Sequence, residues 1–166
     1  MNHVNTYGQT ALSVAATHGH VEAIIALLAA GAEVDNEDEE GDTALCIATQ
    51  NGHGDAVRAL AEAGAAVNHA NNNGDPPLFV AACCGHVEVV RALVEAGAAV
   101  NHVEDDGVTA LYLAAESGHA EAILALLDAG ADLNIASNDG RTPLRAAQAN
   151  NHEAAALALM QAGATE

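Results

Sequence analysis

Short apolar stretches at helical spacing alternate with polar turns along this chain. After Glu104, two sets of apolar residues each fall on one face of a helix: Leu111, Leu113 and Ala114, then Ile123, Leu126 and Leu127. The pattern predicts a short helix over 110–117 and a second from 119 or 120 to 129. Thr109 precedes the first helix, where its hydroxyl can accept a backbone N–H as an N-cap. We therefore expect a helical hairpin in this part of the chain.

Glycines recur at an interval of 33 residues and mark the turns around such helices. Three series keep the interval: Gly8, Gly41, Gly74, Gly107 and Gly140; Gly31, Gly64, Gly97, Gly130 and Gly163; and Gly19, Gly52, Gly85 and Gly118, whose fifth place is taken by Asn151. Glycine is the usual residue where a helix ends in a left-handed conformation, and asparagine is the second choice. A fixed period of this length predicts stacked copies of one helical hairpin.

The helical hairpin is repeated five times with few departures. Each second helix opens at a histidine: His20, His53, His86, His119 and His152. Pro77 and Pro143 occupy the first position of their helices, where a missing N–H costs nothing. Pro76 displaces a capping threonine, so we expect the following helix to be less stable by on the order of 1 kcal/mol unless Asp75 caps it.

The chain is strongly acidic. Its 166 residues include 23 acids against four arginines and no lysine, which gives a formal net charge of −19. Binding to phosphate backbones needs several cations on one face, so neither nucleic acid nor an anionic membrane is expected as a partner. A basic protein surface is the more natural partner.

The apolar runs and the cysteines favour a soluble protein in a reducing, intracellular compartment. The longest apolar run is far below the roughly 20 residues that span a bilayer. No signal segment opens the chain. An odd number of cysteines, namely Cys46, Cys83 and Cys84, argues against a disulfide framework. We therefore expect a cytoplasmic location.

Neither catalysis nor metal binding is expected. The histidines of the Gly-His pairs, and of Asn151-His152 in the fifth copy, lie one per copy and roughly 10 Å apart, too far for successive imidazoles to share a metal. They are expected to close the turn between the helices. No nucleophile has a base beside it at a fixed spacing, and no glycine-rich phosphate loop follows a strand. Cys83 and Cys84 lack a third ligand and are expected to line a groove, with a redox or metal role as the remote alternative. No cofactor is implied.

Acidic residues gather in the turn before the first helix of several copies. They are Asp38, Glu39, Glu40 and Asp42, then Asp75, then Glu104, Asp105 and Asp106, and finally Asp139. Two interpretations stay open: these are solvated turn tips, or the turns align and form a ridge of carboxylates that steers a basic partner. A calcium site fits less well, because the spacing matches no calcium loop.

The repeated sequence resembles the ankyrin repeat over residues 5 to about 164. The resemblance is carried by Thr-Pro-Leu at 142–144 and its counterparts, by the Gly-His pairs, and by the Gly-Ala-x-Val-Asn runs after the second helices. It implies an all-α ankyrin-repeat solenoid of five helix–turn–helix units with projecting hairpin loops, here called fingers. A single domain over 1–166 would contain repeats at about 5–37, 38–70, 71–103, 104–136 and 137–166. The last would be a C-terminal cap, because Glu153 and Ala156 replace apolar residues of the inner copies.

The resemblance also implies a non-enzymatic, monomeric interaction module that binds a partner protein through its fingers and concave face. Transferred by position, the partner-binding residues are Thr6, Tyr7, Gln9, Thr17 and His18; Glu39, Glu40, Asp42, Gln50 and Asn51; Asn72, Asn73, Asp75, Cys83 and Cys84; Asp105, Asp106, Val108, Glu116 and Ser117; and Asn138, Asp139, Arg141, Ala149 and Asn150. The aromatic residues Phe79 and Tyr112 are expected to pack rather than to contact a partner.

Three alternatives to this function stay open. The chain could be a scaffold or assembly subunit that docks through its first repeat, which lacks a polar cap and keeps Val14 and Ile25. It could be a host-directed effector adaptor, which resemblance does not separate from a housekeeping one. A metal-binding protein is the remote alternative. The chain also resembles family members that are modified at the finger asparagine, here Asn68, Asn101 and Asn134.

Overall fold

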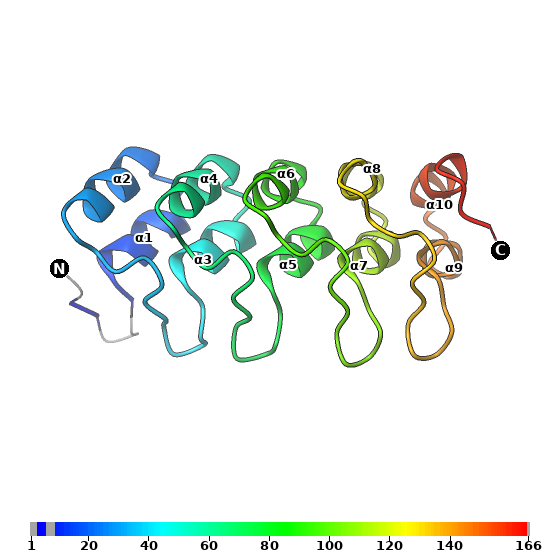
Figure 1. The fold of residues 1–166 in the computed structure, drawn as a ribbon, viewed down its shortest axis with the longest axis horizontal. Coiled ribbons are helices and arrows are strands. Elements are labelled where there is room, and N and C mark those ends of the chain that lie inside the picture. Colours follow the sequence, from blue (N-terminus) through cyan, green and yellow to red (C-terminus); the bar gives the residue numbers. More distant parts are fainter. Residues whose placement is uncertain (1–2, 6–8, 166) are drawn as a thin grey trace.

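The helices stand in two parallel rows, and loops project from one side of the lower row (Figure 1). The structure, a computed structural model, describes residues 3–5 and 9–165. The inner row holds α1 (Ala11–Thr17), α3 (Ala44–Gln50), α5 (Pro77–Cys84), α7 (Ala110–Glu116) and α9 (Pro143–Ala149). The outer row holds α2 (Val21–Ala29), α4 (Gly54–Glu62), α6 (Val87–Glu95), α8 (Ala120–Asp128) and α10 (Glu153–Gln161). Each inner helix packs on the outer helix that follows it and on the inner helices beside it. The expected solenoid of helical hairpins is confirmed.

The helix boundaries follow from the capping residues. Thr109 precedes α7, and its hydroxyl accepts a hydrogen bond from the Tyr112 backbone N–H at 3.2 Å. The predicted helices over 110–117 and up to 129 are observed at 110–116 and 120–128. Pro76 precedes α5 without any side-chain cap, as predicted, and Asp75 does not replace the missing threonine. Asn151 adopts the left-handed conformation expected of it, with φ at 60°.

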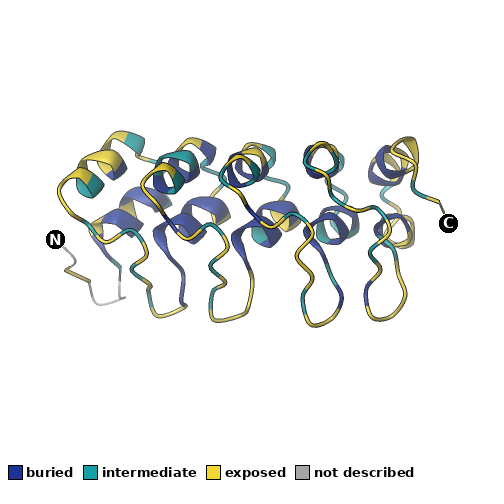
Figure 2. Ribbon diagram, viewed as in Figure 1, coloured by how far each residue is buried: buried dark blue, intermediate teal, exposed yellow. Residues whose placement is uncertain are grey.

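Small residues and leucines fill the space between the rows. Figure 2 shows that the buried residues lie where the helices face one another, while the loops are mostly exposed or half-buried. Leu45, Leu60 and Leu93 are fully buried, and each stabilises the fold by about 1.5–3 kcal/mol relative to an exposed side chain. Phe79 and Tyr112 are each only 3% exposed, so the packing role predicted for both is confirmed.

Histidines join the second, third and fourth repeats each to the one before it. The Nε2–H groups of His53, His86 and His119 donate to the carbonyls of Thr17 at 3.1 Å, Gln50 at 3.1 Å and Cys83 at 2.9 Å. These carbonyls lie in the last turns of the inner helices, where no intrahelical N–H reaches them. The histidines therefore do more than close a turn within one hairpin: they cap the inner helix of the preceding one.

No helix in the described part of the chain combines the length and the apolar character that crossing a bilayer requires.

Candidate functional site

The fingers are short loops, each closed at its base by a backbone hydrogen bond. The bonds run from Asp38 N to Asp42 O at 3.1 Å, from Asn71 to Asp75 at 3.3 Å, from Glu104 to Val108 at 3.0 Å and from Ser137 to Arg141 at 3.0 Å. We call these loops, over 38–42, 71–75, 104–108 and 137–141, the second to fifth fingers. An equivalent bond of 2.9 Å joins Asn5 and Gln9 at the first finger. Its expected contact residues Thr6 and Tyr7 lie outside the described residues.

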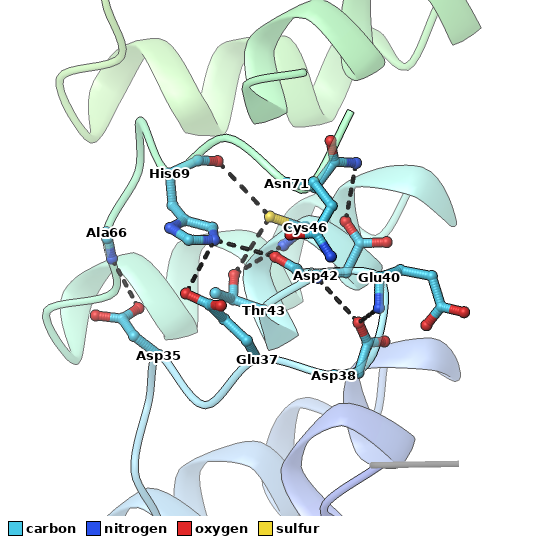
Figure 3. Close-up of polar contacts among 12 residues, drawn as sticks. Asp35, Glu37, Asp38, Glu40, Asp42, Thr43, Cys46, Ala66, His69 and Asn71 are labelled. Atoms are coloured by element: carbon cyan, nitrogen blue, oxygen red, sulfur yellow. Dashed lines mark hydrogen bonds and ion pairs between the residues drawn. The ribbon is translucent and has the colours of Figure 1, made fainter. Parts of the chain in front are cut away.

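A side chain within each finger holds the turn. In the second finger, Asp38 Oδ1 accepts the N–H groups of Glu40 at 3.1 Å and Asp42 at 2.9 Å (Figure 3). Asn71 does the same in the third finger, and its Oδ1 accepts from Asn73 and Asp75. Because short polar side chains satisfy the turn's backbone donors, the finger conformation is set without a partner.

Asp42 has a structural role instead of the predicted contact role. It is 8% exposed, and its carboxylate accepts hydrogen bonds from Gln50 Nε2 at 2.8 Å and from Asn71 Nδ2 at 3.2 Å (Figure 3). The bond to Asn71 reaches into the third finger. A buried carboxylate needs such donors. Because both oxygens of Asp42 already accept hydrogen bonds within the protein, the carboxylate has little capacity left to bind a partner.

Four finger carboxylates remain free. Those of Glu39, Glu40, Asp75 and Asp105 are on exposed residues, and no hydrogen bond or ion pair to them occurs within the described chain. Asp106 accepts from Val108 N–H at 2.9 Å, and Asp139 pairs with Arg141 and Ser137. These partners lower the pKa of the Asp139 carboxyl, the Ser137 hydroxyl most strongly. The acids thus divide into those that stabilise turns and those that face solvent alone.

Asparagines fasten neighbouring fingers together in pairs. Asn72 donates from its side chain to Glu39 O at 3.1 Å and from its backbone to Glu40 O at 3.1 Å. Asn138 repeats both bonds, to Asp105 O and Asp106 O, each at 2.8 Å. Asp105 holds the equivalent place in the fourth finger, and a carboxylate has no proton to donate. No such bond joins the third and fourth fingers in the described structure.

A second ladder runs behind the fingers, where the chain leaves each outer helix. The side-chain oxygens of Asp35, Asn68 and Asn101 accept the N–H of Ala66, Ala99 and Asp132 in the next copy, at 2.9, 2.9 and 2.8 Å. His69 donates from Nε2 to Gly41 O at 3.0 Å and lies 3.5 Å from a Glu37 oxygen (Figure 3). The recurrence of Asp or Asn every 33 positions was a sequence signal for the bonds of Asp35, Asn68 and Asn101. Nothing in the sequence indicated the contacts of His69.

Most of the other predicted contact residues are exposed, at the fingers or at the ends of the inner helices. His18, Gln50, Asn51, Asn73, Cys83, Cys84 and Ala149 are exposed, as is Asn150; Gln9, Thr17, Val108, Glu116 and Ser117 are half-buried. The two exposed cysteines lie in neither a disulfide nor a metal cluster within the described residues. Burial raises the pKa of the Cys84 thiol, and more fully buried Cys46 shifts the same way. The arrangement offers polar side chains on a fixed frame.

The family model for ankyrin repeats, in three copies, matches the chain over residues 1–71, 26–104, 63–137 and 97–165. A comparison with curated proteins finds no match. Ankyrin repeats generally serve as modules for protein–protein interaction. With the helical hairpins, the capping threonines and the fingers all in place, the chain belongs to the ankyrin repeat family.

Proposed function

We propose that the chain binds a basic segment of a partner protein along the edge formed by its fingers. The observation that carries the proposal is the set of four exposed carboxylates without a partner, on Glu39, Glu40, Asp75 and Asp105. They occupy three consecutive fingers. Exposed carboxylates that no internal cation neutralises are free to meet lysine and arginine side chains of another molecule.

The distribution of arginine supports the same assignment. Arg58 is committed to the outer helices, where it contacts Asp55, Glu88 and Glu95. Arg141 is paired with Asp139 in the fifth finger. The second and third fingers contain no cationic side chain other than the imidazoles near their bases. A uniformly negative edge accelerates the encounter with a basic partner and repels acidic ones.

The preformed fingers lower the entropic cost of such binding. The turn bonds of Asp38 and Asn71 and the link from Asn72 to Glu39 exist before any partner arrives. Association then loses little conformational entropy in the backbone, so the modest attraction of exposed charges gives useful affinity. The predicted contact residues at the ends of the inner helices would extend this surface beyond the fingers.

A peptide selection tests the proposal directly. The protein is immobilised and used to select from a library of random displayed peptides, with enrichment of lysine and arginine as the expected result. A selected peptide should bind about tenfold more weakly to E39K/E40K, because two attractions become repulsions. The control is E121K/D128K, which makes the same change in net charge at two exposed residues of the outer helix α8. This variant should keep most of the affinity, because α8 lies away from the fingers (Figure 1).

Three results would refute a basic partner. One is enrichment of apolar or acidic peptides; another is equal loss of affinity in both double variants. Affinity that stays constant when the ionic strength rises from about 0.01 M to about 0.15 M would also refute it, since screening weakens contacts between exposed charges.

A further inference from the structure

A hollow opens to solvent between the fourth and fifth fingers. It is lined by Asp106, Tyr112, Glu116, Asn138, Asp139 and Arg141, among others, and its volume is about 350 Å³. That volume falls within the range of small-ligand sites, and it exceeds what one side chain needs. The hollow brings together six residues that the family resemblance assigned to partner binding, Val108 among them, and Tyr112, which was expected only to pack.

Tyr112 supplies an unused polar group to this hollow. Its side chain is almost wholly buried, at 3% exposure, on the inner helix α7. Its backbone N–H donates to Thr109, and its phenol oxygen forms no hydrogen bond within the described residues. The oxygen is not among the buried polar atoms that lack a partner, so it reaches the solvent of the hollow although the rest of the side chain is buried. A tyrosine hydroxyl at the edge of a buried ring commonly bonds to a partner, and here that partner can come from another molecule.

The charges around the hollow favour a cation. Asp106, Glu116 and Asp139 place three carboxylates around one guanidinium, that of Arg141. Arg141 forms its direct ion pair with Asp139 and also attracts Glu116 at longer range, so the three carboxylates around it exceed its single positive charge by two. Glu116 has no hydrogen bond or ion pair within the described chain, and Asp106 uses one oxygen for Val108 N–H. An anionic ligand would meet a net negative wall.

We propose that the hollow receives an arginine side chain of the bound partner, with its guanidinium between Glu116 and Asp106 and one N–H donating to the Tyr112 hydroxyl oxygen. This rests on the proposed function, because it assumes a basic partner. Arginine fits better than lysine for two reasons. Its planar fork presents five donors to acceptors that lie on separate walls, and its charge is less strongly hydrated, so the partly apolar lining of Val108 and Leu113 costs it less.

The test uses three short blocked peptides, Gly-Gly-X-Gly-Gly, with X as arginine, lysine or uncharged citrulline. Binding is followed by chemical-shift changes of the backbone amides in the full chain at millimolar peptide. Arginine should bind most tightly, then lysine, then citrulline, and the largest changes should fall on Tyr112, Glu116 and Arg141. Y112F, which removes only the hydroxyl, and E116Q should each weaken arginine binding about tenfold. Unchanged thermal melting would show that neither variant alters the fold.

The matched control is E39Q/E40Q, which neutralises carboxylates of the distant second finger. It should leave pentapeptide binding at the hollow intact while weakening the longer peptides selected on the finger edge. Shift changes that avoid the hollow, citrulline binding equal to arginine, or no effect of Y112F and E116Q would each overturn the arginine site. If long basic peptides still require Glu39 and Glu40 in that case, the proposed function stands alone. If they do not bind either, both proposals fail.

Discussion

At the scale of single residues, glycine and histidine from successive copies form one unit. Gly85 ends α5 with φ at 71°, and a methyl group on it would lie 2.5 Å from Nδ1 of His119. The same close approach recurs between Gly19 and His53. The glycine therefore meets two needs: a left-handed backbone, and room for the imidazole that caps the preceding inner helix. Asn151 takes the fifth place in the series, with φ at 60°.

A comparison of two glycine variants separates these needs. Gly97 has φ at 90°, and a methyl group on it would meet nothing within 4 Å. G97A should therefore lower the free energy of unfolding only by the backbone cost, about 1–2 kcal/mol. G85A should cost at least about 1 kcal/mol more, because His119 must move and its bond to Cys83 O is lost. Urea unfolding followed by circular dichroism measures both values.

The double variant G85A/H119A decides whether the imidazole causes the difference. In the H119A background, the loss of unfolding free energy caused by G85A should equal the loss that G97A causes in the wild-type protein. The difference between the effects of G85A with and without His119 is the coupling energy between the two positions. Equal costs of G85A in the presence and absence of His119 would contradict the paired role of glycine and histidine.

At the scale of elements, the fingers form a broken series. Asn72 ties the third finger to the second, and Asn138 ties the fifth to the fourth. Asp105 stands where the link between the third and fourth would begin. Asp105 has a carboxylate oxygen in place of the amide nitrogen that would donate the side-chain bond, and the backbone bond that accompanies the other two links is absent here as well. The break also leaves the Asp105 charge exposed for the proposed partner.

The variant D105N should supply the missing link. Its side-chain amide can donate to the backbone carbonyl of Asn72. This would repeat, one finger further along, the bond from the Asn72 side chain to Glu39 O. We expect the free energy of unfolding to rise by about 1 kcal/mol, the net value of one such hydrogen bond. D75N is the control, because it removes the same charge from an adjacent finger at a position that makes no link. An equal gain in D75N would mean that relief of charge repulsion, and not the new bond, stabilises the protein.

The periodic sequence predicted the elements well and the polar contacts poorly. Helix ends came within a residue or two because each depends on a local residue, such as Thr109 or Gly118. The sequence did not predict which finger carboxylates are hydrogen-bonded and which are free, because that depends on side chains from other elements. Asp42 is buried by Gln50 and Asn71, 8 and 29 positions away, whereas its neighbour Glu40 stays free. Asp42 and Glu40 are both acidic in the sequence, and only the hydrogen-bond partners in the folded structure distinguish them.

At the scale of the whole molecule, repulsion between carboxylates opposes the compact fold. The net charge of −19 is barely relieved by the ion pairs, because 23 acids face only four arginines. Arg58 pairs with three acids, and Arg91 and Arg141 pair with one each. Stacking copies in a row also brings successive acidic fingers side by side (Figure 1). The same edge that would attract a basic partner therefore makes the free protein less stable.

Added salt should consequently stabilise this protein. Two carboxylates 10 Å apart repel by about 0.4 kcal/mol in water, and ionic strength of about 0.15 M shortens the Debye length from about 30 Å to about 8 Å, so many such pairs are screened at once. We expect the free energy of unfolding in urea to rise by on the order of 1 kcal/mol between about 0.01 M and about 0.15 M sodium chloride. In E39Q/E40Q the rise should be smaller, because part of the repulsion is already gone. A stability that falls with salt would mean that attractive ion pairs such as those of Arg58 outweigh the repulsion along the fingers.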